Sequence, residues 1–274
     1  MKKCSLVIPV YRNEENLPRL LSELERLRAL VAGELEVVFV VDGSPDRCLE
    51  ILRDRLPLAG FRSQLLALSR NFGSFAAIAA GMARARGEYI AVMAADLQEP
   101  IELANRFYEL MGAGKADIAI GVRGGRSDPW LSSLASNVFW GLYRRFVIHE
   151  MPAGGVDVFG CTAEVRDHVL QLHGVDTNLV ALLFWVGFRR EYVVYERQKR
   201  MEGRSAWTLA KKVRYSVNSI FNFSDLPIQI LLYAGGISLV LALVTSALVI
   251  VAKLRGDIAV PGYTPTVLAI LFFG

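Results

Sequence analysis

Tyr89-Ile-Ala-Val-Met-Ala-Ala-Asp96-Leu-Gln98-Glu-Pro100 is a short apolar run that ends in a carboxylate and, two residues later, a carboxamide. It predicts a buried strand over 89–94 that delivers Asp96 to the carboxyl edge of a sheet, where open α/β sheets bind ligands. Asp96 and Gln98 are oxygen donors of the kind that suits Mg²⁺ or Mn²⁺, which in turn hold substrate phosphates. A helix-capping role for the Asp is the alternative, so the rest of the chain must decide.

Short apolar runs alternate with helical patterns along the N-terminal half. We expect strands at 5–10, 36–41, 65–69, 89–94 and 118–121, and helices at 16–31, 46–56, 74–85 and 101–111. Asn16 is the candidate N-cap of the first helix. The alternation predicts an α/β fold with a mainly parallel sheet and helices on both faces. No G-x-G-x-x-G or Walker A pattern occurs, which argues against dinucleotide-binding and P-loop proteins.

The most apolar part of the chain lies near its C-terminus. Residues 226–252 include no charged side chain, and about 25 helical residues span roughly 37 Å, enough to cross a bilayer core of about 30 Å. This run raises the hydrophobic content to 53% and the mean hydropathy to +0.34. We therefore expect a transmembrane helix at 226–252. At 266–274 we expect the start of a second one that the chain end cuts short, with a tail that lies at the membrane interface as the alternative.

The segments between the predicted sheet and this helix have their own patterns. Residues 131–147 and 206–223 have the pattern of amphipathic helices. Residues 156–162 have the pattern of a strand that returns to the sheet. A helix at 206–225 is expected to lie in the headgroup plane, with packing on the globular domain as the alternative. The globular domain is expected to cover 1–205.

Basic residues concentrate just before the predicted membrane helix. Residues 189–214 include nine basic and three acidic side chains, a local charge of about +6 in a chain of net charge +4. The positive-inside rule then places the globular domain on the cytoplasmic side of the inner membrane. The adjacent membrane helix argues against a nucleic-acid surface. The short N-terminal apolar run predicts no secretory signal, and the three cysteines and three histidines lack metal-ligand spacing.

Polar side chains follow the predicted strands. They come from segments 11–16, 42–46, 70–73 and 96–98, and from Arg123. In a parallel sheet these strand ends share one edge, so an aromatic ring, carboxylates, an amide and an arginine can meet there. An aromatic ring with Asp42 suits a base and ribose, and Asp96 with a metal ion and arginines suits a diphosphate.

The order of these motifs resembles that of family 2 glycosyltransferases of GT-A fold, in the branch of dolichol-phosphate mannose synthases and bactoprenol-phosphate glucosyltransferases. The elements that carry the resemblance are Val7-Ile-Pro-Val-Tyr11 with Glu14, Glu15 and Asn16, then Asp42-Gly-Ser44, Ser69-Arg-Asn-Phe-Gly73, Asp96-Leu-Gln98, Gly121-Val-Arg123, Gly203-Arg-Ser205 with Trp207, and Phe223-Ser224 before the membrane helix. The resemblance covers essentially the whole chain.

The resemblance implies inverting transfer of a sugar from a nucleotide diphosphate, with UDP favoured, to a polyprenyl phosphate such as undecaprenyl phosphate. The reaction would take place at the cytoplasmic membrane face, in cell-envelope glycan assembly or modification, and the family suggests a homo-oligomer. Mg²⁺ or Mn²⁺ would be held by Asp96 and Gln98. The implied donor-binding residues are Pro9, Tyr11, Asn13, Glu14, Asp42, Ser44, Asn71, Ala95, Asp96 and Arg123. The implied catalytic residues are Asp96, Arg123 and Arg204, and those for the acceptor phosphate are Arg200, Arg204 and Lys211.

Three positions depart from the family pattern. Ala94 stands where a first carboxylate is usual, Val41 where an Asp usually precedes Asp42, and Arg12-Asn13 where an Asn-Glu pair is usual. The change at Ala94 removes one metal ligand, which Mg²⁺ tolerates because it normally keeps several waters. Two alternatives therefore stay open: a non-catalytic membrane-anchored scaffold of this fold, and a glycosyltransferase with a polysaccharide or another lipid as acceptor.

Overall fold

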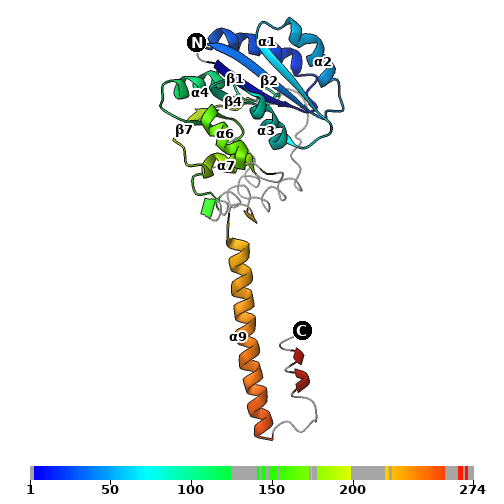
Figure 1. Cartoon of the computed structure of the whole chain (residues 1–274), viewed down its shortest axis with the longest axis vertical. Helices are drawn as coiled ribbons and strands as arrows, with labels where there is room; N and C mark the ends of the chain where they lie inside the picture. Colours follow the sequence, from blue (N-terminus) through cyan, green and yellow to red (C-terminus); the bar gives the residue numbers. More distant parts are fainter. Residues whose placement is uncertain are drawn as a thin grey trace. The chain divides into compact units, whose positions relative to one another are not determined.

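The computed structural model describes residues 3–124, 141, 144–145, 148–152, 155–172, 174, 178–198, 220–221, 224–256, 265–267 and 269–270. The chain divides into two compact units, Met1–Phe223 and Ser224–Gly274. The first unit contains the sheet and its helices, and the second contains one long apolar helix (Figure 1).

Within the described residues, the first unit is built on a seven-stranded sheet of order β3-β2-β1-β4-β6-β5-β7. The strands are β1 (Lys3–Val10), β2 (Glu34–Asp42), β3 (Arg62–Leu68), β4 (Tyr89–Val92), β5 (Ile118–Arg123), β6 (Phe159–Thr162) and β7 (Arg190–Tyr195). Neighbouring strands pair in parallel, except that β6 is antiparallel to both β4 and β5. The sheet is therefore mainly parallel, and the predicted α/β fold is confirmed.

Helices cover both faces of this sheet (Figure 1). They are α1 (Leu17–Leu30), α2 (Cys48–Arg55), α3 (Ser74–Arg84), α4 (Glu102–Gly112), α6 (Ala163–Leu172) and α7 (Leu179–Trp185). Leu6 and Ile8 of β1 pack with α1, α2 and α4, whereas Val7 packs with α3, α6 and α7. Because successive side chains of a strand point to opposite faces, a strand with both sets buried has to be covered on both sides.

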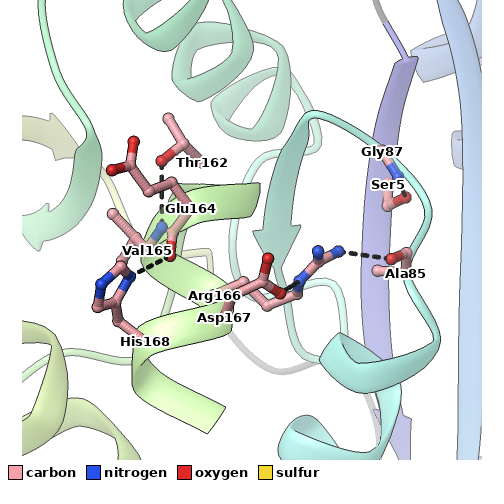
Figure 2. A network of polar contacts seen from close by, with 9 residues as sticks. All are labelled: Ser5, Ala85, Gly87, Thr162, Glu164, Val165, Arg166, Asp167 and His168. Atoms are coloured by element: carbon pink, nitrogen blue, oxygen red, sulfur yellow. Dashed lines mark hydrogen bonds and ion pairs between the residues drawn. The ribbon is translucent and has the colours of Figure 1, made fainter. Parts of the chain in front are cut away.

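Polar contacts fix α6 to the segment that leads into β4 (Figure 2). The guanidinium group of Arg166 donates to the backbone carbonyl of Ala85 at 2.7 Å and pairs with Asp167 at 2.8 Å. Two residues further along, the Gly87 amide donates to the buried Ser5 hydroxyl of β1 at 2.8 Å. The entry into β4 is thus held from two sides, which fixes the strand whose other end leads to the site.

Some predicted boundaries differ from the structure. β4 ends at Val92 rather than at residue 94, and the returning strand begins at Phe159 rather than at residue 156. Asn16 is at the N-cap position of α1, as predicted, but its side chain makes no capping hydrogen bond. Its side-chain amide donates to Asn13 Oδ1 at 3.1 Å instead. The predicted amphipathic helices at 131–147 and 206–223 lie mostly outside the described residues.

The second unit contains α9 (Leu226–Leu254), a helix of 29 residues with a mean hydropathy of 2.4 over its most apolar window. Only 6% of that window is buried inside the protein. By length and composition α9 can cross a bilayer core. The predicted helix at 226–252 therefore exists as a helix, while its place in a membrane stays a prediction.

Candidate active site

The site lies at the edge of the sheet where β1, β2, β3, β4 and β5 end. These strands run in the same direction, so their carboxyl ends share that edge. β6 runs the opposite way between β4 and β5, so the residues just before it, including Asp157, also reach this edge. The topology therefore gathers side chains from the two halves of the described sheet.

Hydrogen bonds tie the loops after β1 and β2 together. The Arg12 amide donates to Ser44 Oγ at 2.8 Å, and the Arg47 amide donates to Glu14 Oε2 at 2.8 Å. Ser44 in turn donates to Asp46 Oδ1 at 2.6 Å. Burial by itself would raise the pKa of Asp46, but hydrogen bonds, chiefly from Ser44, hold it below its usual value. The two loops thus form one polar surface.

Asp42 fixes the loop that follows β3. Its side chain is 2% exposed, and its two carboxylate oxygens accept hydrogen bonds from the amides of Phe72 at 2.7 Å and Gly73 at 2.9 Å. The side-chain amide of Asn71 donates to the Asp42 carbonyl at 3.3 Å. The predicted donor residues Asp42 and Asn71 are therefore neighbours, and Asp42 orders the loop whose exposed Asn71 borders the edge.

The backbone at this edge includes left-handed conformations. Among the described residues, Arg12 (φ 54°) and Leu97 (φ 53°) are the non-glycine residues with positive φ. Such conformations cost on the order of 1–3 kcal/mol each and gather at functional sites. Gly43 (φ +55°) approaches Arg70 so closely that a Cβ would lie 2.3 Å from the Arg70 carbonyl carbon. Only glycine fits there, and the close approach joins the second loop to the third.

Gln98 links the acidic loop after β4 to the chain after β7. The Asp96 carboxylate accepts a hydrogen bond from the backbone amide of Gln98 at 3.3 Å. The buried Gln98 carboxamide oxygen accepts from the Arg197 guanidinium at 2.6 Å, and the Gln98 carbonyl accepts from the Gln198 amide at 2.8 Å. The described chain after β7, at Arg197 and Gln198, is therefore anchored beside the acidic loop.

Glu99 is a buried carboxyl group that the sequence patterns do not single out. Its side chain is 2% exposed. Burial raises the pKa of Glu99 to about 7, helped by the negative charges of Asp96 and Asp157 and opposed by Arg197 and Arg123. A pKa near neutral in such a place is typical of functional sites as well as of buried ion-pair networks.

Arg123, at the end of β5, forms an ion pair with Asp157. Burial would lower the pKa of Arg123, but Asp157 raises it, so the guanidinium stays charged. Burial, Asp157 and Glu99 together raise the pKa of Tyr195 to about 12, so this phenol is neutral at pH 7. The neighbourhood of Arg123 thus contains both a fixed cation and a neutral hydroxyl.

The structure brings the described site residues together in two adjoining groups. Pro9, Tyr11, Asn13, Glu14, Asp42, Ser44 and Asn71 border the ends of β1 to β3, and Ala95, Asp96, Gln98 and Arg123 border the ends of β4 and β5. β1 and β4 are neighbours, so the groups adjoin. The roles of these residues stay predictions. Arg200, Arg204 and Lys211 lie outside the described residues.

Four residues that interact with the second group are not predicted from the sequence: Glu99, Asp157, Tyr195 and Arg197. Glu99 directly follows Gln98, and Arg197 lies in the basic segment 189–214, so the sequence could have marked both as candidate site residues. Asp157 and Tyr195 become recognisable only once β6 and β7 have been placed in the sheet.

Comparison with known proteins identifies the family. The profile described as Glycosyl transferase family 2 matches residues 5–169, which include the loops after β1 to β5. The chain belongs to this family. The Bacillus subtilis glycosyltransferase YkcC is 30% identical over 98% of this chain and 83% of its own. The prophage bactoprenol glucosyl transferase homolog of Escherichia coli is 29% identical over 99% of this chain and 89% of its own.

A solved structure shares the fold of this glycosyltransferase. Glucosyl-3-phosphoglycerate synthase from Mycobacterium tuberculosis, in complex with Mn²⁺, UDP and glucosyl-3-phosphoglycerate, superimposes with a TM-score of 0.50. The match is 13% identical and covers 80% of this chain and 77% of that one. The predicted GT-A fold and the resemblance to polyprenyl-phosphate glycosyltransferases are thereby confirmed.

Proposed function

We propose that this glycosyltransferase moves a sugar from a nucleotide diphosphate, preferably a UDP-sugar, to a polyprenyl phosphate such as undecaprenyl phosphate. The observation that carries the proposal is the similarity to the Escherichia coli bactoprenol glucosyl transferase homolog, which extends over 273 residues and so includes α9. A soluble donor and a lipid acceptor together account for a polar sheet edge and an apolar helix in one chain.

The nucleoside end of the donor is assigned to the loops after β1, β2 and β3. Pro9 and Tyr11 would contact the base, and the second lone pairs of the Asp42 carboxylate would accept from ribose hydroxyls. Asn13, Glu14, Ser44 and Asn71 would complete this part of the site. The hydrogen bonds that join Arg12 to Ser44 and Asp42 to Phe72 support the assignment, because they order the three loops before the donor arrives.

The diphosphate is assigned to the second group with a divalent cation, Mg²⁺ or Mn²⁺. Within the described residues, no group of three His, Cys, Asp or Glu side chains is arranged to hold a metal ion. The residues nevertheless fit Mg²⁺, which is usually bound through one or two carboxylates plus substrate phosphates and water. Asp96 and the carboxamide of Gln98 would hold the cation, which would neutralise charge on the departing diphosphate. Mn²⁺ and UDP occur together in the synthase from Mycobacterium tuberculosis.

The chain has little proton chemistry to perform in this reaction. A phosphate monoester has a second pKa of about 6, so the acceptor is largely a dianion at pH 7 and needs no general base. Alignment of its oxygen with the anomeric carbon is then the main task. Arg123 would bind phosphate on the donor side, and Arg200, Arg204 and Lys211 on the acceptor side. In-line attack inverts the anomeric centre and gives a β-linked lipid phosphate from an α-linked donor.

The membrane arrangement follows from charge and hydropathy. Residues 189–214 carry nine basic and three acidic side chains, and α9 follows after a further eleven residues. By the positive-inside rule the catalytic unit would face the cytoplasm, with α9 in the inner membrane. The basic segment would also attract anionic lipid and the acceptor headgroup.

A transfer assay with paired acceptors tests this function. The full chain in detergent or nanodiscs is offered undecaprenyl phosphate or undecaprenol, each with a panel of UDP- and GDP-sugars. We expect a β-linked sugar on undecaprenyl phosphate from one donor, and none on undecaprenol. Absence of lipid product with every donor, or preferred transfer to a polysaccharide, would contradict the proposal.

A further inference from the structure

Glu99 has a carboxylate oxygen that nothing described in the chain uses. The side chain is 2% exposed, and Oε2 makes no hydrogen bond within the described residues. Buried polar atoms are almost always paired, and an unpaired one in a native fold points to a water or an ion that belongs there. The oxygen belongs to the acidic loop of the second group, since Glu99 directly follows Gln98 between β4 and α4.

Both guanidinium groups near Glu99 already have other partners. Arg123 is paired with Asp157, and Arg197 donates to the Gln98 carboxamide oxygen. Within the described residues, neither of them donates to Glu99 Oε2. A cation beside Asp96 and Glu99 would give this oxygen a partner.

The neighbouring side chains leave the cation without a second carboxylate. The Gln98 carboxamide oxygen is a neutral ligand, and Arg197 already occupies one of its two lone pairs. Ala94 offers no side-chain oxygen. Building on the proposed function, we propose that Glu99 supplies the second carboxylate that holds the divalent cation together with Asp96, in place of the one missing at Ala94.

Mn²⁺ binding to the full chain in detergent tests this assignment. Electron paramagnetic resonance would measure the Mn²⁺ affinity in the presence of UDP and without acceptor. Glu99→Gln keeps the shape and removes the charge, and we expect it to weaken Mn²⁺ binding by about 10- to 100-fold. Glu102→Gln is the matched control, because Glu102 lies three residues away on α4 with its side chain 53% exposed, and its Mn²⁺ affinity should not change.

Two further variants keep the test decisive. Ala94→Asp combined with Glu99→Gln should recover most of the lost affinity, because it returns a carboxylate two residues before Asp96, at a partly exposed position. If Glu99→Gln does not fold, Glu99→Asp retains the charge but withdraws the carboxylate by one methylene, and it too should weaken Mn²⁺ binding.

The outcomes separate this inference from the proposed function. Unchanged Mn²⁺ affinity in Glu99→Gln, with loss of binding in Asp96→Asn, overturns the role of Glu99 and leaves the proposed function intact. A wild-type chain that binds no Mn²⁺ with UDP overturns the cation site altogether. A chain that binds Mn²⁺ through Glu99 but glycosylates no lipid phosphate supports the inference and refutes the proposed acceptor.

Discussion

The difference in stability between Glu99→Gln and the wild type should depend on pH. In EDTA, the pKa of Glu99 rises from 4.5 in the unfolded chain to about 7 in the folded one. Between these values the unfolded chain loses the Glu99 proton while the folded chain keeps it, so wild-type stability falls as the pH rises. One pH unit corresponds to about 1.4 kcal/mol, so the full loss is roughly 3 kcal/mol. Glutamine does not titrate and escapes this loss.

Thermal unfolding in detergent and EDTA, from pH 5 to pH 8, measures the difference between the two proteins. Glu99→Gln should gain about 2–3 kcal/mol on the wild type over this range, because most of the titration lies within it. For a unit of this size the gain corresponds to a relative rise in Tm of about 5–10 °C. Saturating Mn²⁺ and UDP should reduce or reverse this Tm difference. These ligands bind the folded chain, and they should stabilise the wild type more because it binds Mn²⁺ more tightly than Glu99→Gln does. A Tm difference that is constant with pH would refute the reasoning about the buried carboxyl group.

Further predictions concern the loops and the cysteines. Gly43→Ala should lower the free energy of unfolding by at least about 3 kcal/mol and abolish UDP binding in calorimetry, because its Cβ would lie 2.3 Å from backbone. Gly114 also has a positive φ but has open space around it. Gly114→Ala should therefore lower the free energy of unfolding by only about 1 kcal/mol and bind UDP normally. Equal effects of the two substitutions would contradict the close approach of the loops. Cys4, Cys48 and Cys161 are all buried, and burial raises the pKa of the latter two to about 12, so a thiol reagent at pH 8 should label none in the native state and all three after unfolding. Rapid labelling of the native protein would contradict this packing.

The parallel part of the fold follows from local patterns, and the remainder depends on distant pairing. Apolar runs such as those of β1 and β2 identify buried strands, and the polar residues that follow them identify the edge of the sheet. β6 enters between β4 and β5 in the opposite direction, and β7 returns to the far side of β5. No local periodicity encodes either placement, which is why Asp157 and Tyr195 escape prediction.

The same limit applies to individual site residues. Asp96 and Gln98 can be proposed from the sequence, because a carboxylate and an amide follow a buried strand and similar polar residues follow the other strands. Glu99 stands beside them in the sequence, but the charges that act on it include those of Asp157 and Arg197, which are more than fifty residues away in the chain. The chemistry of a residue type is local, whereas its electrostatic environment is set by the fold.

The most direct test of the account is sugar transfer by Asp96→Asn. With undecaprenyl phosphate, the preferred UDP-sugar and Mg²⁺ or Mn²⁺, the wild type and the control Asp54→Asn, on the exposed side of α2, should form lipid-linked sugar at similar rates. The rate of Asp96→Asn, and that of the wild type in EDTA, should be lower by a factor of at least about 100, because negative charge on the departing diphosphate would no longer be stabilised. Undiminished transfer by Asp96→Asn would contradict the claim that the acidic loop after β4 is the catalytic centre.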